Sequence, residues 1–249
     1  MKGERVKQKS EDTMHTDRPA GGFPHGVESV PPVGDRESDN LAFMARSDAV
    51  TLFLVRHGQA GGNGTVDGFI GPALSECGER QAQLVAARFA ALPLKLDHIY
   101  CSDMARSSQT AEAVGRLCPD TPLSVLPELR EISALHGNVA DHPETAEVAV
   151  RLREERDRAI RFAARLRGLH TRGQVVAVVA HNGFNGMLVA ELAGVAYRTT
   201  VRLVSCHTGV SVVSLSDAVP NTVVRLMGCT RHLPAELVTD INAVIIPQE

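Results

Sequence analysis

The sequence has neither a strong excess of one charge nor a long apolar run. Its 249 residues carry 26 Lys and Arg against 29 Asp and Glu, which gives a formal net charge of −3. This balance gives no electrostatic reason to expect a nucleic acid or an anionic membrane as partner. No apolar stretch reaches the ~20 residues of a membrane span, and the N-terminus lacks the apolar segment of a signal peptide. We therefore expect no nucleic-acid partner and no membrane association.

Cysteine is too scarce and too irregularly spaced to build a disulfide framework. The cysteines are odd in number and none is part of a Cys-x-x-Cys pair (Cys77, Cys101, Cys118, Cys206 and Cys229). Such a pattern is typical of reduced, mostly buried thiols in a reducing compartment. The expected localisation is therefore cytoplasmic.

Residues 1–49 lack the apolar periodicity of a folded segment. They are rich in Lys, Asp, Glu, Pro and Gly, and this composition buries too little apolar surface to offset the entropy that is lost on ordering. We predict a disordered N-terminal tail over residues 1–49, with residues 41–44 as a short lead-in that packs on the domain. Residues 50–249 are long enough to form one α/β catalytic domain with a full core.

From residue 51 onward, short β-branched runs alternate with segments of helical periodicity. The pattern predicts strands at 51–55, 96–101, 123–126, 174–180, 210–215 and 222–226, and helices at 76–91, 104–117, 144–169 and 183–193. Alternating strands and helices predict a three-layer α/β/α sandwich with a mainly parallel central sheet.

The most informative motif follows the first predicted strand. Arg56, His57 and Gly58 come directly after the apolar run 51–55, and ligands of open α/β sheets bind outside the carboxyl ends of the strands. An arginine suits a phosphate as a bidentate donor, and a histidine suits it as a nucleophile or as an acid and base. Glycine lets the backbone approach the ligand closely. The motif therefore predicts a phosphate site.

Two further predicted strands end in polar or cationic residues. The second apolar run, 175–180, is followed by His181, and the run 96–101 is followed by a segment that contains Arg106. If the three strands are parallel, their carboxyl ends meet at one edge of one sheet. A cluster of this kind is hard to obtain from residues that serve the core alone.

Arg106 is expected in the first turn of a helix whose N-cap is Ser102 or Asp103. A cation in that position opposes the helix dipole by roughly 0.3–1 kcal/mol. The same helix end attracts anions. A bound phosphate would therefore turn an unfavourable placement of Arg106 into a favourable one.

Together, these motifs resemble the histidine phosphatase superfamily, also called phosphoglycerate-mutase-like. The order and spacing agree from about residue 50 to residue 240. The matching elements are Arg56-His57-Gly58 with Asn63 beyond it, Leu74-Ser75-Glu76-Cys77-Gly78-Glu79-Arg80-Gln81-Ala82, Ser102 with Arg106 and Thr110-Ala111, Leu129-Arg130-Glu131, His181, and His232-Leu233-Pro234-Ala235-Glu236-Leu237.

The resemblance implies a catalytic role for each matching polar residue. His57 attacks phosphorus as a neutral imidazole and forms a phosphohistidine, while its far nitrogen is held by an acceptor such as a backbone carbonyl. Arg56, Arg106 and His181 stabilise the charge on the transferring phosphoryl group. Glu131 protonates the leaving alkoxide and then accepts the proton of the attacking water. No metal and no cofactor are required, because cationic side chains neutralise the charge.

Several of these assignments have alternatives. Asn63 is expected to donate to a phosphoryl oxygen, but it lies between glycines and suits a turn with positive φ equally well. Asn182 stands where many members of the family have a glycine, and its backbone N–H serves there instead. Glu128 is the alternative to Glu131 as the general acid. His207 is expected to be a structural or rim residue.

We predict a metal-independent phosphomonoesterase of the histidine acid phosphatase type that acts on a small phosphorylated metabolite. The alternatives are a cofactor-dependent phosphoglycerate mutase and a catalytically silent phosphate-binding or interaction module. The segment 132–143 lacks the Gly-x-x-Glu-Gly arrangement that is common in the glycolytic mutases and in many phosphatases, which weakens the mutase alternative and leaves the substrate open. The four intact candidates Arg56, His57, Arg106 and His181 argue against the third. A homodimer is left open.

Overall fold

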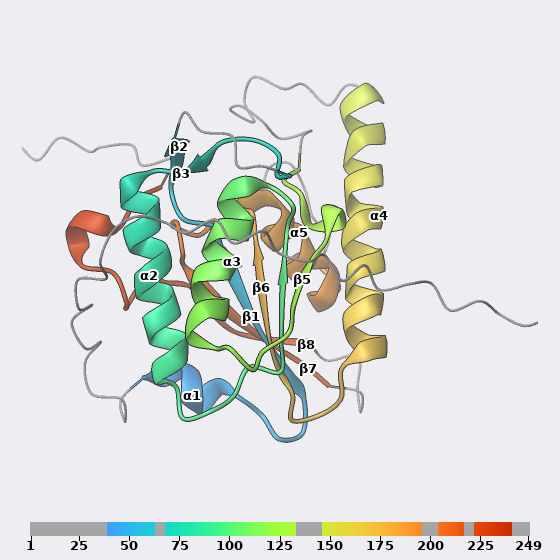
Figure 1. Ribbon diagram of the computed structural model, residues 1–249. Helices are drawn as coiled ribbons and strands as arrows, with labels where there is room; N and C mark the ends of the chain where they lie inside the picture. Colours follow the sequence, from blue (N-terminus) through green and yellow to red (C-terminus); the bar gives the residue numbers. More distant parts are fainter. Residues whose placement is uncertain (1–38, 63–67, 133–145, 196–203, 217–221, 241–249) are drawn as a thin grey trace, which may run out of the picture.

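The computed structural model describes residues 39–62, 68–132, 146–195, 204–216 and 222–240 (Figure 1). The helices are α1 (Asn40–Met44), α2 (Glu76–Ala91), α3 (Ala105–Leu117), α4 (Ala146–Leu169) and α5 (Asn182–Ala193). The strands are β1 (Val50–Arg56), β2 (Ala60–Gly62), β3 (Ala73–Leu74), β4 (His98–Cys101), β5 (Leu123–Val125), β6 (Val175–Ala180), β7 (Val210–Leu215) and β8 (Thr222–Cys229). In the part of the chain that is described, no helix has the length and apolar character needed to cross a membrane.

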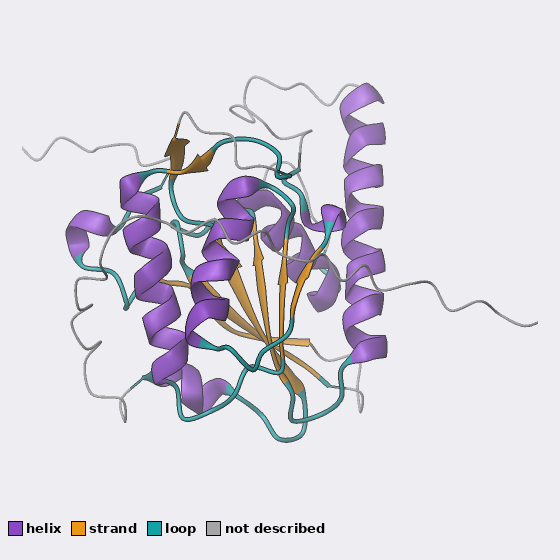
Figure 2. Cartoon of the chain, in the orientation of Figure 1, coloured by secondary structure: helices purple, strands orange, loops and turns teal. Residues whose placement is uncertain are grey.

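A six-stranded sheet in the order β5-β4-β6-β1-β7-β8 forms the centre of the molecule (Figure 2). The four strands β5, β4, β6 and β1 run parallel to one another. β7 is antiparallel to both β1 and β8. Because β4, β6 and β1 are parallel neighbours, their carboxyl ends meet at one edge, as the sequence predicted.

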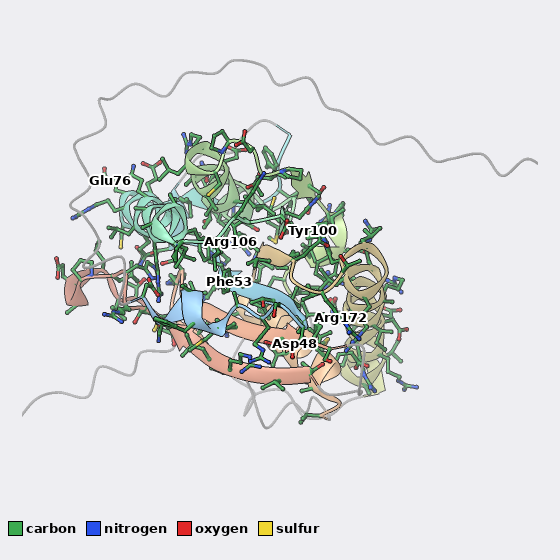
Figure 3. All side chains as sticks on the ribbon, turned by 90° about the horizontal axis from the view of Figure 1, so that it is seen from below. Asp48, Phe53, Glu76, Tyr100, Arg106 and Arg172 are labelled. Carbon is green, nitrogen blue, oxygen red and sulfur yellow. The ribbon has the colours of Figure 1, made fainter. Side chains whose placement is uncertain are left out.

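Both faces of the sheet are covered, because successive side chains of a strand point to opposite faces. Leu52 and Leu54 of β1 belong to a core cluster with α4 and α5. Phe53 (labelled in Figure 3) and Val55 belong to a second cluster with α1, α2 and α3. The result is the three-layer α/β/α sandwich with a mainly parallel sheet that the alternation of elements predicts.

The predicted strands of the central sheet and the helices α2 to α5 agree closely with the observed ones, but β2 and β3 were not predicted and the predicted N-cap of α3 is wrong. Its N-cap is Met104, which makes no side-chain capping bond, and not Ser102 or Asp103. The backbone N–H of Ala105 instead donates to the carbonyl of Ile70 at 2.9 Å. Asp103 forms an ion pair with Arg130. A tertiary contact and an ion pair have therefore replaced the local cap.

Residues 39–49 fall within the predicted tail, but the structure packs α1 on the domain, as expected for the lead-in 41–44. Leu41 of α1 is fully buried in the cluster beneath α2. Asp39 caps α1 by accepting from the N–H of Leu41 at 3.0 Å, and it forms a two-point ion pair with Arg88 of α2. Residues 1–38 lie outside the described residues, so a disordered tail there stays a prediction.

We expect Asp39→Ala to destabilise the domain. The Arg88 side chain is 0% exposed in its pair with Asp39, and removal of the partner leaves a buried charge uncompensated, at a cost of about 3 kcal/mol. Urea unfolding followed by circular dichroism measures this loss. The control is Asp48→Ala, which breaks the exposed pair with Arg46 and should hardly move the midpoint. Equal midpoints for the two variants would contradict the prediction.

Candidate active site

The site begins at the carboxyl end of β1. Arg56 is the last residue of that strand, and the N–H of His57 extends the pairing with β6 by donating to the carbonyl of Ala180 at 2.9 Å. Arg56 is 2% and His57 5% exposed. The backbone of these two candidate residues is thus fixed by the sheet.

Gly58 allows the chain beyond His57 to turn against the first turn of α2. A Cβ on Gly58 would lie 2.6 Å from the carbonyl oxygen of Gly78, and a Cβ on Gly78 would lie 2.0 Å from the carbonyl oxygen of Gln59. Gln81, one turn further along α2, accepts from the N–H of Gln59 at 2.8 Å. The two glycines of the sequence motifs are therefore explained by one close backbone contact.

The hydrogen bonds of His57 indicate its tautomer. Nδ1 lies 2.7 Å from the carbonyl oxygen of Gly58, which can only accept, so Nδ1 carries the proton. Nε2 accepts from Nε of Arg106 at 3.0 Å, because arginine only donates. Burial, with further contributions from His181 and Arg106, holds the pKa of His57 well below 6.5. At neutral pH His57 is therefore a neutral imidazole with a lone pair on Nε2.

Arg106 reaches His57 from the second residue of α3 and is 8% exposed. Burial lowers the pKa of its guanidinium; the charge of Glu131 raises it and that of Arg56 lowers it further. Thr110, one turn along α3, donates to the carbonyl of Arg106 at 2.7 Å and accepts from the N–H of Gly58 at 3.0 Å. This hydroxyl ties the start of α3 to the loop after His57.

His181 lies at the end of β6, is fully buried and is the N-cap residue of α5. Its ring centroid is 5.0 Å from that of His57. The next residue, Asn182, accepts from the N–H of Ser205 through its side-chain oxygen at 2.8 Å. Asn182 therefore connects the start of α5 to the segment that precedes β7.

The two candidate general acids, Glu131 and Glu128, have different surroundings in the structure. The carboxyl oxygens of Glu131 accept from the N–H groups of Gly183 at 3.4 Å and Phe184 at 3.2 Å, at the start of α5 beside His181. A Cβ on Gly183 would lie 2.7 Å from Oε1 of Glu131, so only glycine leaves room for this approach. Glu128 faces Arg165 of α4 instead, at 3.2 Å.

His207, which was expected to be a structural or rim residue, is a neighbour of His57. It is 3% exposed, and its ring centroid is 5.7 Å from that of His57. It immediately precedes Thr208, Gly209 and β7. Because β7 is antiparallel, the beginning of β7 meets the carboxyl ends of its neighbours. A polar residue directly before a strand can therefore indicate a site residue such as His207. The indication holds only when the strand is known to be antiparallel to its neighbours.

The structure thus brings Arg56, His57, Arg106, Glu131, His181 and Asn182 to one edge of the sheet. Asn63 lies outside the described residues. In the described ranges, no group of three or more His, Cys, Asp or Glu side chains is arranged to hold a metal ion.

Comparison with known proteins identifies the class. The profile of the histidine phosphatase superfamily (branch 1) matches residues 52–226, and that range holds every one of these candidates. The chain belongs to this superfamily, whose members act on small phosphorylated substrates.

Named relatives include both phosphatases and mutases. The chain is 39% identical over 82 residues to a Schizosaccharomyces pombe protein described as a probable phosphatase, an alignment that covers 32% of this chain and 38% of that protein. It is 36% identical over 83 residues to a probable phosphoglycerate mutase of Photorhabdus laumondii, covering 32% and 37%. The chain thus matches well under half the length of either relative.

A solved structure supports the fold. The alpha-ribazole phosphatase of Shigella flexneri superposes with a TM-score of 0.57 at 21% identity, covering 72% of this chain and 96% of that chain. At this identity the likeness shows the phosphoglycerate-mutase-like fold alone.

Proposed function

We propose that the protein is a phosphomonoesterase that acts through a phosphohistidine on His57 and hydrolyses a small phosphorylated metabolite. The observation that carries the proposal is the state of His57. Its Nδ1 proton is bonded to the Gly58 carbonyl, its Nε2 lone pair is directed at the Arg106 guanidinium, and its pKa is held well below 6.5. A neutral imidazole with a cation at its nucleophilic nitrogen suits an attack on a phosphoryl group.

In the first step Nε2 of His57 attacks phosphorus, and the bond between phosphorus and the ester oxygen breaks. The N–H of Arg106 that His57 accepts in the free protein turns to a phosphoryl oxygen, because the Nε2 lone pair is now used for bonding. Arg56, Arg106 and His181 stabilise the charge that gathers on the equatorial oxygens. The leaving alkoxide takes a proton from the Glu131 carboxyl group.

In the second step a water attacks the phosphohistidine. Glu131, now a carboxylate, accepts the proton of that water. The bond between phosphorus and Nε2 breaks, the electron pair returns to His57, and inorganic phosphate leaves. The position of Glu131 beside His181 supports its role over that of Glu128, which is paired with Arg165 away from this edge.

A phosphoglycerate mutase is the second candidate, favoured by the likeness to the Photorhabdus laumondii protein. It uses the same phosphohistidine but returns the phosphoryl group to a hydroxyl of the substrate and not to water. The two functions differ only in the acceptor. A direct comparison of acceptors therefore separates them.

We expect the purified protein to hydrolyse p-nitrophenyl phosphate in the presence of EDTA and to be inhibited by vanadate. EDTA should have no effect, because the charge in the proposed mechanism is neutralised by side chains, and vanadate should inhibit because it mimics the five-coordinate transition state. Release of phosphate and formation of 2-phosphoglycerate from 3-phosphoglycerate, with and without 2,3-bisphosphoglycerate, are measured in parallel. Isomerisation without phosphate release would make the protein a mutase. Loss of hydrolysis on chelation would contradict metal independence, and phosphate binding without turnover would indicate the silent module.

A further inference from the structure

The guanidinium of Arg56 is held by partners that none of the motifs predicts. Nη1 donates to the carbonyl of Ser205 and to Asp240, the latter at 2.9 Å. Nη2 lies 3.2 Å from Nε2 of His207. Nε is buried and has no hydrogen-bond partner among the described residues. A guanidinium has five N–H donors, and these contacts engage three of them, so two N–H groups, one on Nε and one on Nη2, are left without a partner among these contacts.

His207 accepts the hydrogen bond from Arg56. A guanidinium has donors and no acceptor, so Nε2 of His207 supplies the lone pair and its proton sits on Nδ1. Nδ1 in turn faces two acceptors of Thr239, the carbonyl oxygen at 3.1 Å and the hydroxyl at 2.9 Å. Burial and the charge of Arg56 lower the pKa of His207 to about 4. The ring is therefore neutral at pH 7 and correctly oriented to accept.

The hydrogens of Arg56 that remain belong to two adjacent nitrogens, Nε and Nη2. Both hydrogens of Nη1 are engaged by Ser205 and Asp240, and one of Nη2 is engaged by His207. The N–H of Nε and one N–H of Nη2 are left, on adjacent nitrogens of the guanidinium. Two adjacent nitrogens of an arginine are the donors that bind two oxygens of one phosphate.

From these contacts we propose that His207 is a positioning residue. It fixes the rotation of the Arg56 guanidinium so that the Nε and Nη2 atoms of Arg56 bind the phosphoryl group at His57. This inference rests on the proposed function. His207 touches Arg56 and its ring lies 5.7 Å from that of His57, so it acts through the arginine and not on the substrate.

The chain holds His207 rigidly enough for this task. Thr208 has a φ of +54°, which is unfavourable for a β-branched residue. Its N–H donates to the carbonyl of Arg56 at 3.0 Å, and its hydroxyl lies 3.0 Å from Nε2 of His232. On the other side, Gln81 donates to the hydroxyl of Thr239 at 2.8 Å. The backbone that follows His207 and the residue that its Nδ1 faces are thus both anchored.

Two substitutions separate positioning from a purely structural role. His207→Gln puts an amide oxygen near the place of Nε2 and keeps an acceptor for Arg56. His207→Asn puts a donor near the place of Nδ1, so it keeps the bond to Thr239 but loses the acceptor. If His207 serves only to tie down Thr239, Asn should be the milder change. If it positions Arg56, Gln should be the milder one.

The measured quantities are KM for p-nitrophenyl phosphate, the inhibition constants of vanadate and inorganic phosphate, and the melting temperature. For His207→Asn we expect KM and both inhibition constants to rise about tenfold, which corresponds to one hydrogen-bond-sized loss, with an almost unchanged melting temperature. His207→Gln should recover most of this loss. His98→Asn, at the opposite edge of the sheet and bonded to Ser124, is the matched control and should behave as the wild type.

A double-mutant cycle measures whether His207 acts through Arg56. In an Arg56→Ala background, His207→Asn should change the phosphate inhibition constant less than twofold, because the group through which it acts is gone. Equal tenfold losses in both backgrounds, or an Asn variant milder than the Gln variant, would overturn the inference. If the wild type does not turn over, the proposed function fails separately. The cycle is then run on calorimetric binding of inorganic phosphate, where the same coupling between Arg56 and His207 is expected and its absence refutes the inference.

Discussion

His57→Ala should lower turnover of p-nitrophenyl phosphate by about 10⁴–10⁶, the size of effect expected when a nucleophile is removed. The loss follows from the absence of the Nε2 lone pair, since the remaining cations still bind the phosphate but nothing forms the covalent bond. With labelled substrate, the wild type should show a base-stable, acid-labile phosphoryl group that maps to His57 after rapid quenching. The variant should show no label.

The control for this result is His98→Ala, the same substitution at a histidine outside the site. It should keep both the label and the turnover. A His57→Ala protein that still binds phosphate but does not react would also show that the loss is chemical. If turnover in the His57→Ala variant stays within tenfold of the wild type, the covalent mechanism is wrong.

The elements that the sequence predicts best are those defined by local chemistry. α2 spans Glu76–Ala91 as predicted, because Ser75 caps it through the N–H of Gly78 at 3.1 Å and the apolar positions recur with helical period. The edge at which β1, β4 and β6 end was predictable as well. The carboxyl ends of parallel neighbouring strands lie at the same edge of the sheet, so the polar residues that follow these strands lie there together.

What the sequence does not reveal are contacts between segments far apart in the chain. Asp240 meets Arg56 across 184 residues, and no local pattern marks either as the partner of the other. His207 joins the site because β7 is antiparallel, a direction that periodicity does not encode. The cap of α3 was mispredicted for the same reason, since Asp103 turns to Arg130. The partners of these residues are determined by contacts between distant segments, and the local propensities of the sequence do not predict them.

Glu131→Gln should have an effect that depends on the leaving group. Glycerol 2-phosphate has an alkoxide leaving group that needs a proton, and removal of a general acid should lower its hydrolysis by roughly 10²–10⁴. p-Nitrophenolate leaves without a proton, so the loss on p-nitrophenyl phosphate should be much smaller. Burst kinetics must accompany the comparison, because Glu131 is also the base in the second step. If breakdown of the phosphohistidine limits turnover, the rate of the burst and not the steady rate carries the difference.

A purely structural role of Glu131 at the start of α5 would give equal losses on both substrates, so the ratio of the two rates is the decisive readout. Glu128→Gln is the matched control. It removes a carboxylate paired with Arg165 and should leave that ratio unchanged; if instead it alone shows the leaving-group dependence, the acid is Glu128.

Gly183→Ala should displace the side chain of Glu131 while keeping its carboxyl group, and so tests the same role by a second route. The added Cβ would lie 2.7 Å from Oε1, and the carboxylate, as the free end of a side chain, can give way at little cost in stability. Alanine also favours the helix over glycine by about 1 kcal/mol. The melting temperature should therefore hold or rise while hydrolysis of glycerol 2-phosphate falls more than that of p-nitrophenyl phosphate. A Gly183→Ala protein with an unchanged rate ratio would mean that proton transfer does not depend on where α5 holds Glu131.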